Sequence, residues 1–189
     1  ESRHFVALVC SPVAKNMINA FWYQLNEINS GMGRPQNVPH KTFRKVAILG
    51  AGMMGAGVAY VAAKSGIEVA LKDVSIDRAE QGKEYSRKLV GKRVQRKRMS
   101  QEDADRLLDL IHPCAEVEML SDAELVIEAV YEDRTLKARV TKEAETVLTD
   151  EVIFASNTST LPITGLGSAS IRPAQFIGLH FFSPVDKMQ

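Results

Sequence analysis

Three glycines stand together where a short apolar run ends. Residues 46–49 are followed at once by Gly50, Gly52 and Gly55, at the spacing GxGxxG, and then by small residues typical of a helix. In such a turn one glycine permits the tight bend, one lets main-chain N–H groups approach a pyrophosphate, and one allows close packing of helix on strand. Glycine-rich turns without a ligand are common, so this motif alone leaves both interpretations open.

A carboxylate follows the next apolar run. Asp73 comes after residues 67–71, at the distance from Gly50 where a carboxylate accepts hydrogen bonds from ribose hydroxyls. It would also repel a 2′-phosphate, so the combination favours NAD over NADP. Lys72 is the one neighbour that weakens this discrimination. The alternative for Asp73 is an ordinary turn residue or an acid in the first turn of a helix.

Hydroxyls and a histidine follow two further apolar runs. Residues 156–160, Ser-Asn-Thr-Ser-Thr, come after 152–155, and His180 comes after 176–179. Ligands of open α/β sheets bind at the carboxyl ends of the strands, so these side chains are candidates for catalysis. The alternatives are helix capping before Leu161 for the hydroxyls, and a packed or surface histidine for His180.

A run of basic residues lies between residues 83 and 98. It holds one acid, Glu84, and eight basic residues: Lys83, Arg87, Lys88, Lys92, Arg93, Arg96, Lys97 and Arg98. Such a run can bind nucleic acid, a membrane surface or a phosphorylated substrate, although a solvated helix face is the commonest explanation. No helix-turn-helix or RNA-binding pattern accompanies it, so we expect no nucleic-acid partner.

Short apolar runs alternate with helical patterns from residue 45 onward. Strands are expected at 46–49, 67–71, 125–130, 152–155 and 176–179. Helices are expected at 52–64, 76–98 and 134–148, and another begins after Ser100, where Asp103 completes a variant capping box. Short apolar strands separated by helices predict α/β architecture: a Rossmann-type, doubly wound, mostly parallel sheet with helices on both faces.

A separate segment precedes this sheet. Residues 11–31 predict a linker helix, with Ser11 as N-cap and Pro12 at the first helical position. Glycine and proline among polar residues then predict a connector up to residue 44. The chain begins at Glu1 without a methionine, which suggests a piece of something longer.

Composition excludes several classes of protein. Of 189 residues, 45% are apolar and 25% charged, and the net charge is +1, which is typical of one globular domain and not of disordered or fibrous chains. No apolar run approaches the roughly 20 residues that span a bilayer, so membrane insertion is not expected. Cys10 and Cys114 offer neither a disulfide framework nor a metal site, and both are expected to be buried thiols.

Four motifs together resemble one enzyme family. They are 46–57 (VAILGAGMMGAG), 126–133 (VIEAVYED), 155–159 (ASNTS) and 178–185 (GLHFFSPV). In order and spacing they are similar to the 3-hydroxyacyl-CoA dehydrogenases, over residues 45–189. The resemblance implies NAD-dependent oxidation of L-3-hydroxyacyl-CoA to 3-ketoacyl-CoA, in fatty-acid β-oxidation.

The resemblance also implies roles for single residues. His180 falls on the catalytic histidine and Ser159 on the active-site serine. Ser86 and Arg93 fall near positions that meet coenzyme A. Ser183 stands where single-function members often have asparagine, and serine is similar to the multifunctional branch. The implied cofactor contacts are Gly50, Gly52, Met54, Gly55, Asp73, Val130, Glu132, Lys137, Ser159 and Ser183.

The segment before residue 45 resembles the connector behind the enoyl-CoA hydratase domain of multifunctional β-oxidation enzymes, especially bacterial alpha subunits. The resemblance therefore implies a cytoplasmic bacterial enzyme, with a thiolase subunit and further copies of the chain as expected partners. The family pairs its histidine with a glutamate about twelve residues downstream and adds a helical substrate domain; neither falls within residues 1–189. We therefore expect the fragment alone to be nearly inactive. Two alternatives stay open: an NAD-binding module without turnover, and another NAD-dependent hydroxy-acid dehydrogenase.

Overall fold

The computed structural model describes residues 1–35 and 37–188, which fall into two units, Glu1–Lys41 and Thr42–Gln189. The last residue of the expected nucleotide-binding domain, Gln189, lies outside the described residues.

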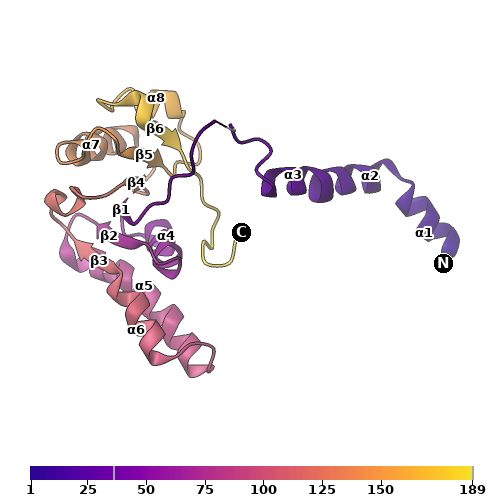
Figure 1. The fold of residues 1–189 in the computed structure, drawn as a ribbon, viewed down its shortest axis with the longest axis horizontal. Helices are drawn as coiled ribbons and strands as arrows, with labels where there is room; N and C mark the ends of the chain where they lie inside the picture. The colour runs from indigo at the N-terminus through magenta and orange to yellow at the C-terminus, as the bar shows by residue number, and fades with distance from the viewer. Residues whose placement is uncertain (36, 189) are drawn as a thin grey trace. The chain divides into compact units, whose positions relative to one another are not determined.

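The first unit is helical (Figure 1). Helix α1 spans Ser2–Val9 and α2 spans Pro12–Ile18, which continues through a π-helical stretch, Asn19–Gln24, into α3, Leu25–Asn29. Ser11 caps α2, because its side chain accepts a hydrogen bond from the Ala14 N–H at 3.1 Å. The expected helix is thus present with the expected cap, and α1 precedes it without having been predicted.

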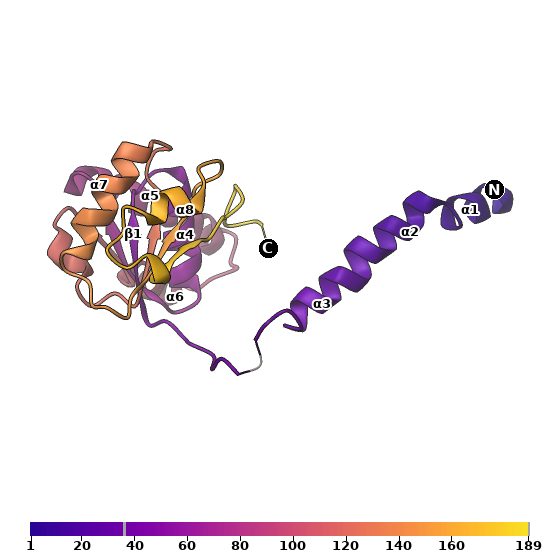
Figure 2. The ribbon, with the colours of Figure 1, turned by 90° about the horizontal axis from the view of Figure 1, so that it is seen from above.

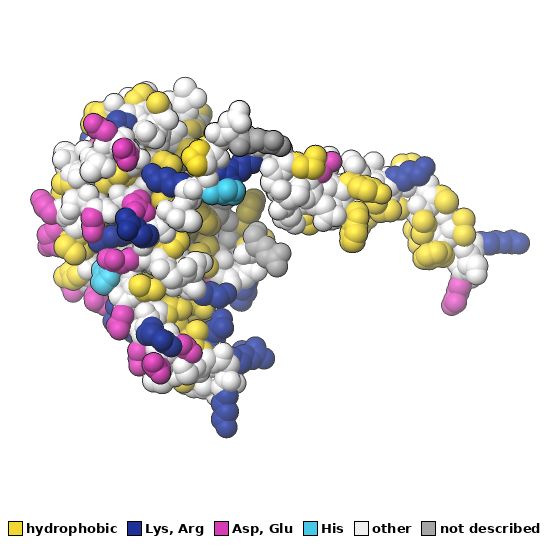
Figure 3. All heavy atoms as spheres, in the orientation of Figure 1, with side chains coloured by type: hydrophobic (Ala, Val, Ile, Leu, Met, Phe, Trp, Pro, Cys, Tyr) yellow, Lys and Arg dark blue, Asp and Glu magenta, His cyan; other side chains and the backbone are white. Residues whose placement is uncertain are grey.

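No residue of these helices is buried, and apolar side chains cover much of their surface (Figure 3). The expectation that Cys10 is buried is wrong, because Cys10 follows directly on α1, a helix without buried residues, and is itself exposed; Cys114 is buried as expected. Among the described residues no single helix is long and apolar enough to cross a membrane. Only Ser2–Val9 and Pro12–Asn29 taken together, across a 60° bend, meet that test of length and composition.

The second unit is built on a six-stranded parallel sheet in the order β3-β2-β1-β4-β5-β6. The strands are β1 (Lys45–Leu49), β2 (Glu68–Lys72), β3 (Ile111–Cys114), β4 (Leu125–Glu128), β5 (Ile153–Ser156) and β6 (Phe176–Gly178). This order is that of the Rossmann fold, so the predicted fold class is confirmed. Strand β3 was not predicted, because an edge strand that contains His112 and Pro113 carries no apolar run.

Helices connect the strands, and polar side chains define where several of them begin. The helices are α4 (Met53–Lys64), α5 (Ile76–Gln95), α6 (Gln101–Asp109), α7 (Arg134–Glu145) and α8 (Ile163–Gly167), with short 3-10 turns at Val117–Leu120 and Pro173–Gln175. The side chains of Ser75, Ser100 and Asp133 accept hydrogen bonds from main-chain N–H groups of α5, α6 and α7. Each of these caps satisfies an N–H group that the helix itself leaves free.

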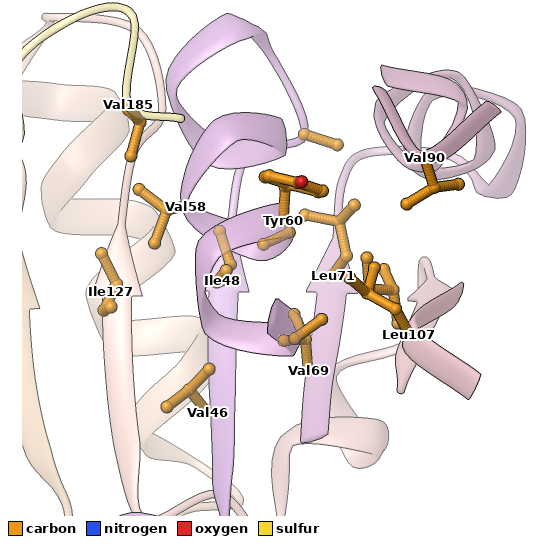
Figure 4. Close-up of a cluster of buried hydrophobic side chains, with 14 of the residues drawn as sticks. Val46, Ile48, Val58, Tyr60, Val69, Leu71, Val90, Leu107, Ile127 and Val185 are labelled. Carbon is orange, nitrogen blue, oxygen red and sulfur yellow. The ribbon is translucent and has the colours of Figure 1, made fainter. Parts of the chain in front are cut away.

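Strand residues alternate between two hydrophobic cores, one on each face of the sheet. Val46 and Ile48 belong to the core that also contains side chains of α4, α5 and α6, shown in close-up in Figure 4. Ala47 and Leu49 belong to the other core, with Ala144 of α7. Because side chains of a strand alternate, burial on both faces requires the continuous apolar runs seen in the sequence. Figure 2 shows the compact second unit from above.

The segment after β6 returns over the α4 and α5 side of the sheet. Val185 is buried in the core shown in Figure 4, where a Cβ added at Gly57 of α4 would lie only 3.0 Å from the Val185 Cβ. The Tyr85 hydroxyl of α5 donates a hydrogen bond to Asp186 at 2.7 Å. Burial and this bond raise the pKa of Tyr85 to about 12. These two contacts anchor the stretch of chain that follows His180.

Candidate functional site

The candidate site lies at the carboxyl ends of β1 and β4. These strands are neighbours in the sheet, and the helices that follow them, α4 and α7, pack on opposite faces (Figure 1). The point where the strand order reverses is where open α/β sheets leave a crevice for a ligand. A cleft of about 540 Å³ occupies this place, lined among others by Gly50, Gly52 and Asp73.

The glycines of the turn are required by close approaches of the backbone. Gly50 has a φ of +95°, and a Cβ there would lie 2.9 Å from the Ala129 carbonyl oxygen. A Cβ at Gly55 would lie 1.8 Å from the Gly50 oxygen, so helix α4 could not begin so close to β1. At Gly52, in contrast, an added Cβ would meet nothing within 4 Å. Gly50 and Gly55 thus serve the fold, while Gly52 keeps open the space in front of the helix.

The N-terminus of α4 fits a phosphate group. Its N-cap is Gly52, which has no side chain to accept hydrogen bonds from the first N–H groups of the helix. Those groups are left for an outside acceptor, and the positive end of the helix dipole favours an anion there. An uncapped helix start that opens on a large cleft is the arrangement that a dinucleotide pyrophosphate requires.

Asp73 closes the cleft on the β2 side. Its Oδ2 accepts a hydrogen bond from the Ala51 N–H of the glycine turn, and its Oδ1 accepts one from the Val74 N–H, both at 2.7 Å. The turn-residue interpretation is therefore part of its role. Each carboxylate oxygen has a further lone pair, so acceptors remain for the hydroxyls of a ribose.

Charged side chains surround this end of the cleft. Lys72, the neighbour that weakened the discrimination against a 2′-phosphate, forms an ion pair with Glu143 of α7 at 3.0 Å. Arg78 and Arg139 also line the cleft. The Lys72 charge is thus matched by a carboxylate, while Asp73 and the two arginines line the same cleft.

A second hollow of about 290 Å³ adjoins the cleft, and the two share Met54, Ala129 and Val130. It is lined by residues from the segments that follow β4, β5 and β6, among them Glu132, Ser159, His180 and Ser183. Residues that lie far apart in the sequence thus meet next to the cleft, because the strands that precede them all end at the same edge of the parallel sheet.

His180 is oriented by the loop after β5. Its Nδ1 lies 3.1 Å from the main-chain oxygen of Thr158, and the Phe182 ring packs edge-on at 5.1 Å between centroids. A carbonyl oxygen accepts and never donates, so the contact requires the proton on Nδ1 and leaves Nε2 as the basic nitrogen. The Asn157 side chain also accepts a hydrogen bond from the Phe181 N–H at 2.8 Å. The histidine that the sequence left without an orienting partner thus has a main-chain one.

Glu132 accepts several hydrogen bonds from the same loop. Its Oε1 accepts hydrogen bonds from the Thr158 hydroxyl at 2.5 Å and from the main-chain N–H groups of Ser159 and Thr160 at 3.0 and 3.1 Å. Burial raises the pKa of this carboxyl, but these bonds and the nearby Lys137 ammonium outweigh it and lower the pKa to about 2. Glu132 is therefore held as an anion at the edge of the hollow.

A buried ion pair lies beneath Glu132. The Lys137 ammonium donates to both carboxylate oxygens of Glu128, at 2.7 and 3.0 Å, and lies 3.3 Å from Glu132. Glu128 also accepts bonds from the Val130 N–H and the Ser156 hydroxyl. The Lys137 side chain is only 3% exposed and lines neither hollow. In this structure the Lys137 ammonium contacts Glu128 and Glu132, and the cofactor contact expected of it stays a prediction.

The residues expected to meet coenzyme A lie on α5. Ser86 is fully buried, on the face of the helix that also carries Ala79 and Gly82, so the expected substrate contact is not open to it in this arrangement. Arg93 is half-buried, seven residues further along the same helix. The Ser86 hydroxyl and the Arg93 Nε have no hydrogen-bond partner among the described residues. Basic side chains gather at the end of the helix, at the lower tip in Figure 3.

Several residues of the site were missed by the sequence reasoning. Glu128 had a signal, because it is the one charge in an otherwise apolar strand, and a buried carboxylate needs partners. Asn157 and Thr158 were included in the candidate stretch 156–160, with helix capping as the alternative, but no partner was predicted for either. For Thr158 helix capping is part of the answer, since its hydroxyl also accepts a hydrogen bond from the Leu161 N–H.

Comparison with known proteins agrees with this arrangement. Residues 45–189 match the family model described as "3-hydroxyacyl-CoA dehydrogenase, NAD binding domain". The whole chain is 38% identical to the fatty acid oxidation complex subunit alpha of Shewanella amazonensis and 39% identical to that of Shewanella putrefaciens. It spans 26% of the length of each of these relatives.

Solved structures give the same result. (S)-3-hydroxybutyryl-CoA dehydrogenase from Ralstonia eutropha is similar with a TM-score of 0.75 and 33% identity, over 78% of this chain and 52% of that one. 3-Hydroxybutyryl-CoA dehydrogenase from Escherichia coli has a TM-score of 0.75 and 32% identity, over 78% of this chain and 31% of that one.

Proposed function

Because the chain belongs to the family of NAD-binding domains of 3-hydroxyacyl-CoA dehydrogenases, we propose that it is part of an enzyme that oxidises L-3-hydroxyacyl-CoA to 3-ketoacyl-CoA. The cofactor is NAD. The observation that carries the proposal is the hollow at the end of the cofactor cleft, where His180 and Ser159 lie together. A base and a hydroxyl at that place are what oxidation of a secondary alcohol requires.

The residues act on one oxygen atom of the substrate. The His180 Nε2, free because Nδ1 faces the Thr158 oxygen, takes the proton of the 3-hydroxyl. The Ser159 hydroxyl donates a hydrogen bond to the same oxygen as it becomes a carbonyl. Bound NAD supplies the hydride acceptor. Glu132 fixes the Ser159 N–H and so holds the serine in place.

Cofactor binding uses the rest of the cleft. We place the pyrophosphate at Gly52 and the start of α4, and the adenosine ribose at Asp73. The nicotinamide then extends past Met54 and Val130 toward His180 and Ser183, since these residues line the second hollow. Gly50, which lines the cleft, and Gly55 shape the turn beneath the cofactor.

We further propose how this chain fits into a longer enzyme. The relatives are subunits of a bacterial fatty acid oxidation complex, which supports a cytoplasmic bacterial enzyme, a connector at residues 1–44 behind a hydratase-like domain, and a thiolase partner. The exposed basic residues near Arg93 would receive the phosphates of coenzyme A. The helical substrate domain would lie after residue 189.

The test is the formation of NADH from 3-hydroxyacyl-CoA, followed by absorbance. The 189-residue chain alone should show almost no turnover, because a positioned pair of reactants can be worth about 7 to 11 kcal/mol and the substrate domain is needed to position them. A polypeptide extended through that domain should be active, and His180→Gln should reduce its kcat by roughly 10² to 10⁴.

Two results would contradict the proposal. An extended polypeptide that binds NAD but shows no turnover would favour a binding module, and turnover with simple hydroxy acids but not with acyl-CoA would favour another dehydrogenase. The extended His180→Gln variant should still bind NAD, which separates loss of chemistry from loss of folding.

A further inference from the structure

Three charged side chains are stacked behind the second hollow. Glu128 is fully buried, Lys137 is 3% exposed, and the Glu132 side chain is 32% exposed and reaches the hollow. Together two carboxylates and one ammonium carry one net negative charge. The adjoining Asp133 and Arg134 are exposed and of opposite sign, so they leave that balance unchanged.

The distances between these three side chains place their net negative charge on Glu132, next to the second hollow. Lys137 is bound by both oxygens of Glu128 and stands farther from Glu132, at 3.3 Å against 2.7 Å. The lysine is therefore largely neutralised by the buried carboxylate. Glu132 is then stabilised as an anion by the Thr158 hydroxyl and by two main-chain N–H groups, which carry no net charge. His180 is the other titratable side chain in the lining of the hollow.

The Glu132 carboxylate would interact differently with the oxidised and the reduced cofactor, because their charges differ. The nicotinamide ring is cationic in NAD⁺ and neutral in NADH, while the adenosine and phosphate parts are the same in both. We propose that Glu132, backed by the Glu128–Lys137 pair, shifts the relative affinity of this site toward NAD⁺ and away from NADH, so that the carboxylate lowers the reduction potential of the bound cofactor. The inference rests on the proposed placement of the nicotinamide beside His180.

The expected size follows from elementary electrostatics. One unit charge at the edge of a half-buried site, in an effective dielectric constant of about 20, should change the preference on the order of tenfold. For a two-electron couple a tenfold change corresponds to about 30 mV. The same charge should not discriminate between ligands that lack the nicotinamide.

The experiment measures dissociation constants on the 189-residue chain for NAD⁺, NADH and ADP-ribose, by titration calorimetry at about pH 8, where an ordinary imidazole is neutral. Glu132→Gln should lower the ratio of the NADH constant to the NAD⁺ constant about tenfold. ADP-ribose affinity should stay unchanged. Glu143→Gln is the matched control, because it removes a carboxylate that lines the cleft and not the second hollow, and it should leave the ratio as in the unchanged chain.

A second variant separates charge from contact. Glu128→Gln removes the same charge from behind, without touching the hollow, and should lower the ratio in the same direction by a smaller factor. If Glu132→Gln disturbs folding, seen as lost ADP-ribose binding, Glu128→Gln decides the question. An unchanged ratio in a variant that still binds ADP-ribose overturns the inference. A chain that binds none of the three ligands contradicts the proposed cofactor site instead.

Discussion

Two carboxylate side chains of the candidate site, Asp73 and Glu132, are held in place by hydrogen bonds from main-chain N–H groups. Asp73 accepts hydrogen bonds from Ala51 and Val74, and Glu132 accepts them from Ser159 and Thr160. Such bonds fix the carboxylate oxygens in position before a ligand arrives. Binding therefore costs little further conformational entropy. Replacing either side chain should therefore affect both the ligand and the loop that it ties down.

Replacement of Asp73 should weaken cofactor selectivity. Asp73→Ala removes acceptors for the ribose hydroxyls and should cost NAD on the order of 1 to 3 kcal/mol, or up to about a hundredfold in affinity. The affinity for NADP should rise relative to that for NAD, because the repulsion between Asp73 and the 2′-phosphate is removed while Arg78 still lines the cleft. Calorimetric titration with both cofactors measures this. Asp77→Ala, in the first turn of α5, is the control, and full discrimination in Asp73→Ala would refute the assigned role.

Glu132 should make stability depend on acid pH. Its pKa is about 2 in the folded chain against an ordinary value of 4.5, so the unfolded state takes up a proton first as the pH falls. The stabilisation is therefore present above about pH 4.5 and lost between 4.5 and 2. Because the side chain is partly exposed, we expect no more than about 1 to 2 kcal/mol.

Urea unfolding at several pH values, with Glu132→Gln beside the unchanged chain, checks this. The difference between the two free energies of unfolding should shrink as the pH falls through that range. A difference that stays constant down to about pH 2 would show that the charge of Glu132 contributes nothing to stability.

At the scale of elements, the turn between β1 and α4 combines two demands in three glycines. Gly55 lets the helix pass close to the Gly50 carbonyl, and Gly52 leaves the helix N-terminus open to a ligand. The first demand belongs to the fold and the second to binding. The two positions can therefore be separated by the same small substitution.

Gly55→Ala should destabilise the chain by at least about 2 kcal/mol, because the new Cβ would lie 1.8 Å from a main-chain oxygen. Gly52→Ala should change stability by less than about 0.5 kcal/mol, since the space around it is empty, yet weaken NAD because the methyl group stands where the pyrophosphate approaches. Thermal unfolding and cofactor titration on both variants give the comparison. Equal destabilisation, or normal NAD binding by Gly52→Ala, would contradict this division.

The sequence predicted most strands and helices because their patterns are local. Apolar runs identified five of the six strands of the sheet, and the capping residues Ser11 and Ser100 were correct. Strand β3 was missed because its pairing with β2 comes from tertiary contacts and not from its own composition. The Glu128–Lys137 pair and the Thr158 contact to His180 also depend on folding, since nothing local brings those partners together.

At the scale of the whole molecule, charge is distributed unevenly although the total is near zero. Basic residues cluster at the end of α5, where residues 83–98 hold eight of them and one acid, Glu84. Only Arg87 of the eight forms an ion pair among the described residues, with Glu80 and Glu84. A cluster of this kind raises the local concentration of anions and makes their binding sensitive to salt.

In a polypeptide extended through the substrate domain, acyl-CoA binding should weaken steeply between about 0.05 and 0.3 M salt. A Lys92→Ala, Arg93→Ala double variant should bind more weakly at low salt and show a shallower dependence. Lys64→Ala, in the last turn of α4, removes a charge away from the cluster and serves as control. Unchanged affinity in the double variant would mean that the cluster is a solvated helix face.

We expect the cleft between the ends of β1 and β4 to hold NAD. Titration calorimetry of NAD⁺ into the 189-residue chain tests it most directly, with Gly52→Val as the variant that fills the mouth of the cleft without meeting any atom of the chain within 4 Å of the new Cβ. We predict one NAD⁺ bound per chain, and none in Gly52→Val at unchanged thermal stability. Absence of NAD⁺ binding in the unchanged chain, or equal binding in Gly52→Val, would show that this cleft is not the NAD site.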